Sequence, residues 1–140
     1  MEWKRDEYTI STDPQRLDVA AICAYLQRSY WAAGRPEETI RTALHNSLCF
    51  GLYQGDRQVG LARIITDYAT FFWLCDVYVL EEQRGRGLGK WLVACVLDYP
   101  GLKHINGMLA TRDAHGLYRA YGFTPLEQPA KWMRRPAAAP

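Results

Sequence analysis

The sequence predicts a single α/β domain in which a mixed, mostly antiparallel sheet carries helices on both faces. The first observation is length, because 140 residues suit one domain with one core. The second is the order of the expected elements, since hairpin-type strands come first and one strand–helix–strand crossover follows. This order combines antiparallel and parallel pairs in one sheet. We expect residues 1–135 to form the domain and residues 136–140 to be a disordered tail.

Composition and charge exclude several classes of protein. Hydrophobic residues make up 49% of the chain, and the formal net charge of +2 is too small to indicate a nucleic-acid partner. No apolar run reaches the roughly 18 residues that a membrane span needs. The charged N-terminal segment MEWKRDEY lacks the apolar stretch of a signal peptide. A cytoplasmic protein without a membrane or nucleic-acid partner is therefore expected.

The cysteines do not indicate metal or redox chemistry. They are Cys23, Cys49, Cys75 and Cys95. No two of them form a CxxC pair, and each lies in an apolar run. We expect them to be small hydrophobic residues of the core, and we expect no metal site.

Two helices are expected before the first strand. In the segment STDPQRLDVAAICAYLQRSY, Asp13 can cap a helix with Pro14 at its first position. Apolar residues then recur at helical spacing until residues 31–34, WAAG, end the helix. A second helix begins near Pro36, has two glutamates in its first turn, and ends near Ser47.

Strands dominate the middle of the chain. Residues 48–66 alternate as two strands around a turn at Gly55 and Asp56. Residues 70–80 predict a third, longer strand. A hairpin followed by a third strand is typical of an antiparallel core.

Helix and strand should alternate in the second half. The expected elements are a helix closed by Pro100 and Gly101, a strand over residues 102–111, a short helix capped by Asp113 and ended by Gly122, and an edge strand that reaches Arg135. Gly107, inside the expected strand, indicates a bulge or a close approach by another group.

Glycines occupy every second position between the third strand and the next helix. The glycines are Gly85, Gly87 and Gly89, and Arg84, Arg86 and Lys90 alternate with them. A helix N-terminus presents free N–H groups and a partial positive charge, and glycine lets a ligand approach the backbone. The segment is therefore typical of a phosphate cradle. It is not a P-loop, because Trp91 follows Lys90, and Lys90 stands where a dinucleotide fingerprint needs glycine.

The pattern Arg84-x-x-Gly87-x-Gly89 resembles the acyl-CoA loop of the GCN5-related N-acetyltransferase (GNAT) superfamily. This resemblance implies that backbone amides of the loop bind the diphosphate of acetyl-CoA and that the preceding strand binds the pantetheine arm. The cofactor-binding residues that it implies are Val77, Tyr78, Val79, Arg84, Gly85, Arg86, Gly87, Leu88, Gly89, Lys90 and Thr111. Arg86 and Lys90 are candidates for the 3′-phosphate.

A second segment, AHGLYRAYGF, is similar to a later signature of the same family, with Leu117, Tyr118, Gly122 and Phe123 in the matching places. The resemblance spans nearly the whole chain and implies a GNAT-like central sheet. It gives Tyr118 the role of the general acid that protonates the leaving thiolate. The family often has asparagine where this chain has Thr111, whose hydroxyl can make one of the same hydrogen bonds.

The general base is left open by the sequence. Asp76 is the best placed carboxylate, and we expect it to face away from Val77 and Val79. Partial burial would raise its pKa toward a catalytically useful range. The competing interpretation is a carboxylate bonded to a neighbouring strand or to Arg63. The weaker candidates are Asp67, His115 and a water relay.

The resemblance implies that the first two helices and their linker help to form the acceptor site, and aromatic residues are expected to line it. The substrate-binding candidates are Tyr30, Trp31 and Phe72. Such a lining suits an apolar or cationic acceptor, and core packing is the competing interpretation of each residue.

The resulting hypothesis is an acetyl-CoA-dependent N-acetyltransferase that acts directly on a primary amine of a small molecule or peptide, with a homodimer as one possible assembly. The alternative is a non-catalytic acyl-CoA-binding sensor or interaction module. A nucleic-acid binder that uses Arg84, Arg86 and Lys90 is disfavoured by the low net charge.

Overall fold

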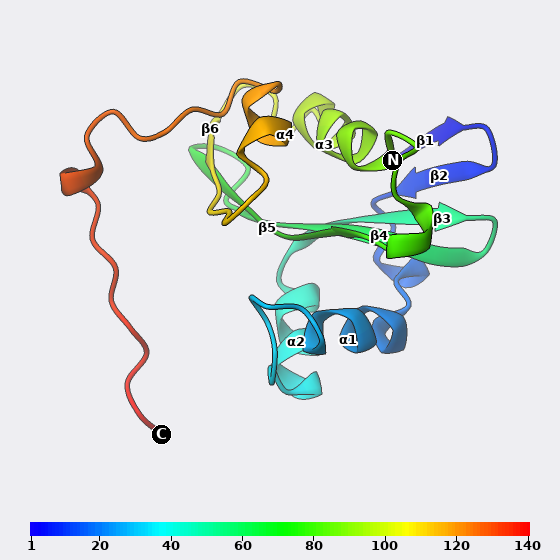
Figure 1. Cartoon of the computed structure of the whole chain (residues 1–140), viewed down its shortest axis with the longest axis horizontal. Helices are drawn as coiled ribbons and strands as arrows, with labels where there is room; N and C mark the ends of the chain where they lie inside the picture. Colours follow the sequence, from blue (N-terminus) through cyan, green and yellow to red (C-terminus); the bar gives the residue numbers. More distant parts are fainter.

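A six-stranded sheet in the order β1-β2-β3-β4-β5-β6 forms the centre of the protein (Figure 1). The computed structural model describes all 140 residues. The strands are β1 (Glu2–Arg5), β2 (Tyr8–Ser11), β3 (Leu48–Gln54), β4 (Arg57–Thr66), β5 (Phe71–Val79) and β6 (Asn106–Met108). The α-helices are α1 (Val19–Gln27), α2 (Glu37–His45), α3 (Leu88–Asp98) and α4 (His115–Arg119). Short 3₁₀ turns occur at Pro14–Arg16, Glu81–Gln83 and Pro129–Lys131.

Strand pairing confirms the predicted mixed sheet. Neighbours from β1 to β5 pair antiparallel, whereas β5 and β6 pair parallel. The parallel pair is short and runs only from Phe71 opposite Asn106 to Trp73 opposite Met108. Beyond Trp73 and Met108 the two strands separate, so one edge of β5 has no partner strand there.

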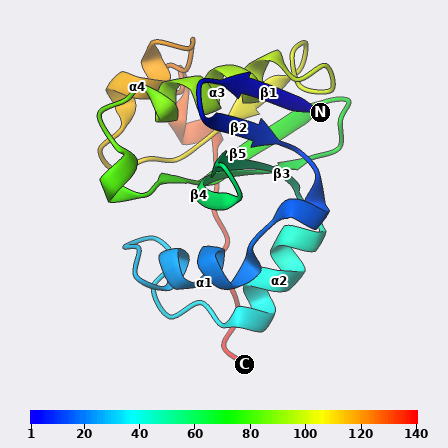
Figure 2. The ribbon, with the colours of Figure 1, turned by 90° about the vertical axis from the view of Figure 1, so that its right-hand side faces the viewer.

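Helices cover both faces of the sheet, as predicted. The helices α1 and α2 lie on one face, and α3 and α4 lie on the other (Figure 2). Each face has its own hydrophobic cluster. Ile22, Leu26 and Ile40 pack in the α1/α2 layer, whereas Leu92 and Val96 of α3 pack in the other. None of the helices is long and apolar enough to cross a bilayer.

The N-terminal region differs from the prediction. The strands β1 and β2 were not expected, because each has only four residues and three of the four in β1 are charged. The first helix is also divided. Asp13 caps a 3₁₀ turn by accepting the N–H of Gln15, and Asp18 then caps α1 by accepting the N–H of Ala21. A second carboxylate cap therefore starts the true helix later than predicted.

The C-terminal prediction of an edge strand is wrong. After α4 the chain leaves the body of the protein without joining the sheet (Figure 1). Pro125 and Pro129 lack the N–H groups that strand pairing needs. Asp113 likewise does not cap α4, since the N-cap residue is Ala114, whose own side chain makes no cap bond.

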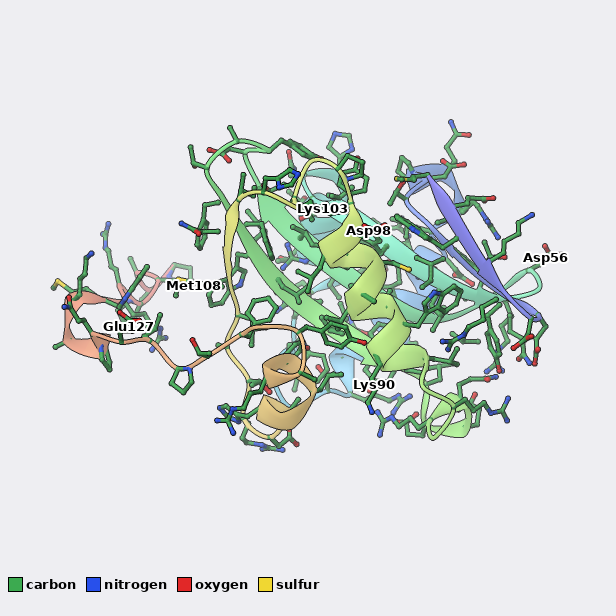
Figure 3. All side chains as sticks on the ribbon, turned by 90° about the horizontal axis from the view of Figure 1, so that it is seen from above. Asp56, Lys90, Asp98, Lys103, Met108 and Glu127 are labelled. Carbon is green, nitrogen blue, oxygen red and sulfur yellow. The ribbon has the colours of Figure 1, made fainter.

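The helix α3 crosses the sheet with its N-terminus toward the pocket described below. Lys90 lies in its first turn, and Asp98 pairs with Lys103 beyond its last turn at 3.0 Å (Figure 3). In the sheet, Gly107 of β6 makes the close approach that its sequence position predicts, and the group that it approaches is the ring of Phe72. A Cβ atom there would lie 2.0 Å from Cζ of Phe72, so only glycine fits.

Candidate active site

A pocket of about 1330 Å³ lies where β5 and the chain after β6 separate. One end is lined by the glycine loop, which we define as residues 84–90. Residues 73–79 of β5 and residues 109–114 form its sides, and Tyr118 of α4 reaches it as well. The loop between α1 and α2 contributes the remaining side. Segments far apart in sequence therefore meet at the break between two strands.

A β-bulge in β5 determines which side chains face the pocket. Leu61 of β4 pairs with Tyr78, but Arg63 pairs with Cys75, so β5 carries an extra residue here. Asp76 takes a φ of 48°, a left-handed value that non-glycine residues seldom adopt.

The extra residue shifts the strand alternation by one position. Before the bulge, Phe72 and Leu74 pack in the α3 layer, and after it Val77 and Val79 do so. Asp76 is thereby turned toward the α1/α2 layer. Its predicted orientation away from Val77 and Val79 is confirmed.

The glycine loop exposes backbone at the start of α3. Gly85 and Gly87 have φ values of 80° and 74°, which glycine adopts without the strain that other residues suffer. Gly87 is the N-cap of α3 and makes no side-chain cap bond, so the first N–H groups of the helix remain free. A Cβ on Gly85 would meet nothing within 4 Å, which leaves the outer surface of the loop bare.

Basic side chains around the loop have different functions. Arg84 braces the loop by donating to the carbonyl of Val79 at 3.1 Å and to Tyr25 at 2.9 Å. Arg86 instead donates to the hydroxyl of Tyr8 at 2.8 Å and lies outside the pocket lining. Of the two predicted 3′-phosphate candidates, only Lys90 lines the pocket.

A residue of β1 also supports the loop. Arg5 donates to the carbonyl of Gly87 at 3.3 Å, and its guanidinium lies 4.6 Å from the ring centroid of Trp91. This support was missed by sequence reasoning because β1 itself was missed.

Tyr118 is brought to the pocket by α4. The residue is 8% exposed, and its ring packs edge-on against Phe123 with centroids 5.9 Å apart. Burial raises the pKa of the phenol to about 12, so it keeps its proton at neutral pH. In this protein only the Tyr53 hydroxyl is fully buried without a hydrogen-bond partner, so the Tyr118 hydroxyl is not such a group. A protonated phenol at the pocket wall can donate to a ligand.

Thr111 lies in the pocket lining, and its Oγ1 accepts the N–H of Ala114 at 3.0 Å. The hydroxyl proton of Thr111 remains available to donate.

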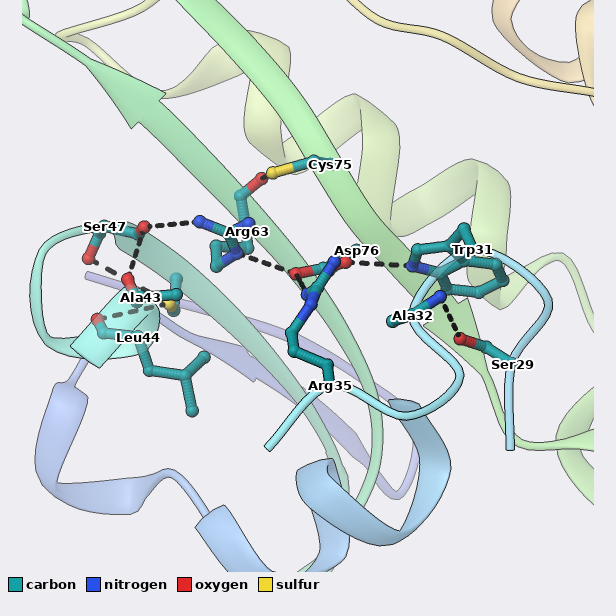
Figure 4. Close-up of polar contacts among 11 residues, drawn as sticks. Ser29, Trp31, Ala32, Arg35, Ala43, Leu44, Ser47, Arg63, Cys75 and Asp76 are labelled. Carbon is teal, nitrogen blue, oxygen red and sulfur yellow. Dashed lines mark hydrogen bonds and ion pairs between the residues drawn. The ribbon is translucent and has the colours of Figure 1, made fainter. Parts of the chain in front are cut away.

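Asp76 is the centre of a hydrogen-bonded cluster (Figure 4). Its Oδ1 accepts the indole N–H of Trp31 at 2.9 Å. Its Oδ2 accepts from Arg63 at 2.8 Å and from Arg35 at 3.0 Å. The carboxylate is 3% exposed, so these three donors provide most of its solvation.

The predicted rise in the pKa of Asp76 is wrong in sign. Burial does push the pKa upward, but hydrogen bonds and charges from Arg63, Trp31 and Arg35 outweigh it. The net pKa lies below the ordinary value of 3.8. The bond to Arg63 is the one that the competing sequence interpretation expected.

We define the acceptor wall as the pocket-lining residues Tyr30, Trp31, Arg35, Arg63, Asp76 and Arg112. The rings of Tyr30 and Trp31 meet edge to face at 5.1 Å, and the guanidinium of Arg112 lies 3.8 Å from the Tyr30 ring centroid. Sequence reasoning missed Arg35 and Arg112, because no motif marks them. Only their positions in the folded structure, beside the other pocket residues, identify them.

Several predicted residues do not reach the acceptor wall. Phe72 is 3% exposed in the α3 layer and lies outside the lining of this pocket. His115 lines a neighbouring pocket. Asp67 accepts the hydroxyl of Thr70 and the N–H groups of Thr70 and Ala69 within its own turn, which lowers its pKa. Neither His115 nor Asp67 lines the pocket that contains the glycine loop, although Tyr118 borders the neighbouring pocket of His115 as well.

The cysteines are free, and three of the four are buried as predicted. Cys75 is partly exposed in the pocket lining, and burial raises its pKa to about 11. It is therefore a thiol at neutral pH. Clusters of three or more His, Cys, Asp or Glu side chains that could hold a metal ion are absent.

Comparisons with known proteins agree with this geometry. The family profile described as Acetyltransferase (GNAT) domain matches residues 45–125, more than half of the chain. A provisionally named acetyltransferase from Gibberella zeae is 36% identical over 140 residues, covering 83% of this chain and 78% of that protein.

Solved structures give the same result. A provisionally assigned GNAT-family acetyltransferase from Xanthomonas campestris has a TM-score of 0.90 and 45% identity, with 93% of each chain covered. A Clostridium acetobutylicum protein described as a predicted acetyltransferase with acetyl-CoA has a TM-score of 0.66 over 92% of this chain and 94% of that one. At 14% identity, the latter is a likeness of fold alone.

Proposed function

The chain belongs to the GNAT superfamily of acetyltransferases, and on this basis we propose that it transfers an acetyl group from acetyl-CoA directly to a primary amine of a small molecule or peptide. One observation carries the proposal: a single pocket joins the glycine loop to Tyr118. A phosphate cradle and a proton donor therefore share one ligand site.

The glycine loop fits the diphosphate of acetyl-CoA. Leu88, Gly89 and Lys90 supply the free amides of the α3 N-terminus, where the helix dipole favours an anion. Lys90 adds a cationic side chain at the same end of the pocket. The acetyl-CoA in the Clostridium acetobutylicum protein supports this choice of ligand for the fold.

The free edge of β5 fits the pantetheine arm. Because β6 stops pairing at Met108, backbone groups of Val77 to Val79 on that edge have no partner strand. An extended chain carrying amides can bond there as an added strand does.

The bound cofactor supplies an activated acetyl group: a C–N bond forms as the C–S bond breaks, the amine releases a proton, and the thiolate takes one up. Tyr118 is the proposed donor of that last proton, since its phenol is protonated and lines the pocket. Thr111 is a second donor in reach of the same space.

We assign Asp76 a positioning role instead of the general-base role. Three donors already occupy its oxygens, and its pKa lies below the ordinary value, so it is a weak proton acceptor. Glu81, also in the lining, is bonded to Arg28, which lowers its pKa to about 2. Water is therefore the proposed acceptor of the amine proton.

Two measurements test the proposal. Titration calorimetry with acetyl-CoA and CoA should give saturable binding, and thiol release should rise with a suitable amine. Binding without thiol release across a broad amine panel would favour the alternative, a non-catalytic acyl-CoA sensor. Absence of binding by either ligand at millimolar concentration would refute both.

A further inference from the structure

The charge of the acceptor wall is carried mainly by arginine. Its members Arg35, Arg63 and Arg112 face one carboxylate of the wall, Asp76. The other carboxylates in the pocket lining are Asp113 and Glu81, and Glu81 is paired with Arg28. A wall with surplus guanidinium groups repels a cation and attracts an anion.

Two of the guanidinium groups share one carboxylate. Arg35 and Arg63 both donate to Oδ2 of Asp76, which leaves one positive charge uncompensated in the cluster. The Arg63 side chain is 11% exposed and also donates to Ser47 at 3.0 Å. Arg35 is 25% exposed and uses only one donor within the protein, so its other N–H groups are free for a ligand.

The third guanidinium group has no carboxylate partner. Arg112 forms no ion pair within 4.0 Å, and it is held instead over the face of Tyr30 at 3.8 Å. Stacking of this kind fixes the planar group without neutralising it. Arg112 and Arg35 are thus two cations on the wall that holds Tyr30 and Trp31.

We propose that the acceptor is a small aromatic amine that also carries a carboxylate. Its carboxylate pairs with the free donors of Arg35 and Arg112, which offer the fork geometry that carboxylates prefer. Its apolar body lies against Tyr30 and Trp31. This inference rests on the proposed function, and it replaces the cationic acceptor that the aromatic residues alone indicated.

The test uses matched amines that differ in the carboxylate alone. The pairs are L-phenylalanine with 2-phenylethylamine, L-tryptophan with tryptamine, and 4-(aminomethyl)benzoate with benzylamine. Binding of each to the CoA-saturated protein is measured by calorimetry, and turnover with acetyl-CoA is measured by thiol release. In at least one pair, the carboxylate member should bind about tenfold or more tightly, as a charge-assisted pair worth about 1.4 kcal/mol implies.

Variants test the assignment to these arginines. Arg112→Gln and Arg35→Gln should each reduce the preference for the carboxylate about fivefold or more and leave binding of the decarboxylated partner unchanged. Arg119→Gln is the matched control, because Arg119 lies on α4 outside the lining of this pocket. Affinity for CoA should stay unchanged in all three, which verifies folding.

Three outcomes would overturn the inference. Equal or tighter binding of the decarboxylated members would do so, as would no measurable binding of any carboxylate to the CoA complex. A carboxylate preference that survives both arginine substitutions would also overturn it. In each case normal CoA binding would leave the proposed function standing, whereas loss of CoA binding by the unaltered protein would remove both.

Discussion

The glycine loop and the acceptor wall are built by different means, although they line one pocket. The loop offers mainly backbone, and its left-handed turns occur at Gly85 and Gly87. The wall offers side chains, and its left-handed residue is Asp76. The loop can take its shape at little cost, because glycine allows it. In the wall, three donors hold the carboxylate of Asp76, whose backbone is in this strained conformation.

This difference affects both binding and stability. A ligand bound by backbone depends on the shape of the loop and little on its side chains. A ligand bound by the acceptor wall depends on groups from the α1–α2 loop, from β4, from β5 and from the segment before α4. Substitutions in the glycine loop and in the acceptor wall should therefore change different properties of the protein.

The largest effect is expected at Tyr118, between the two regions. Tyr118→Phe keeps the ring and removes the proton donor, so kcat should fall about 100-fold or more, the range for general acid catalysis. Acetyl-CoA affinity should change less than about twofold, measured by calorimetry. A kcat within about threefold of the unaltered protein would remove Tyr118 from the mechanism. Tyr121→Phe is the control, because Tyr121 follows α4 and lies outside the lining of this pocket.

Asp76→Asn should have the largest effect on folding. Asparagine tolerates the left-handed conformation, but it leaves two arginines without their carboxylate. The free energy of unfolding in urea should fall by about 3 kcal/mol, as for other broken buried pairs. Asp98→Asn breaks an exposed pair with Lys103 and should cost less than about 1 kcal/mol. A 100-fold loss of kcat with unchanged stability would instead identify Asp76 as the base.

The same carboxylate predicts a pH dependence of stability. Its pKa is below 3.8 in the folded protein and close to 3.8 in the unfolded chain. The unfolded chain therefore binds a proton first, and the stabilisation by Asp76 is lost as pH falls through the folded pKa. The difference in unfolding free energy between the unaltered protein and Asp76→Asn should be constant above about pH 5 and shrink below about pH 4. A difference that stays constant down to pH 2 would contradict this.

Gly87→Ala tests how much the glycine loop depends on backbone conformation. A Cβ there would meet only Arg5 at 3.9 Å, so the cost is the φ of 74° and not a clash. We expect a penalty of about 1–2 kcal/mol, seen as weaker acetyl-CoA binding, lower stability, or both. Gly116→Ala is the matched control, because its Cβ would meet nothing within 4 Å and α4 should gain up to about 1 kcal/mol of stability. Equal effects of the two substitutions would contradict the prediction.

The smallest effect is expected for Trp31→Phe. It removes the N–H that Asp76 accepts at 2.9 Å and keeps an aromatic surface. The unfolding free energy should fall by about 1 kcal/mol, and KM for the acceptor should rise several-fold without a change in acetyl-CoA affinity. Trp132→Phe in the exposed C-terminal segment should change neither. A change confined to acetyl-CoA affinity would show that the two regions are not separable.

The parts of the fold that sequence predicted well have strong local signals. The helix α2, the strands β3 to β5 and the helix α3 lie where periodicity, turns and caps indicated. The strands β1 and β2 were missed, because four residues give too short an alternation and the charged residues of β1 weaken it further. The expected C-terminal strand failed for a related reason, since β-type residues there are separated by prolines.

The residues of the site likewise fall into those that local sequence motifs predicted and those that only the fold brings together. The glycine spacing and Tyr118 were visible in the sequence because each belongs to a local motif. The environment of Asp76 was not, because Trp31 and Arg35 come from a loop more than 40 positions earlier. Burial alone predicted a raised pKa, and only the folded structure supplies the donors that reverse it. Arg112 was missed for the same reason.

At the stack between Tyr30 and Arg112, ligand selectivity can change with little loss of stability. Both side chains are exposed, and neither hydrogen bonds to the cluster around Asp76. Paired replacements at these two positions would reshape and recharge the pocket mouth while the buried anchor stays intact. A combinatorial library restricted to these two positions would therefore test how far the ligand preference of the pocket can be changed.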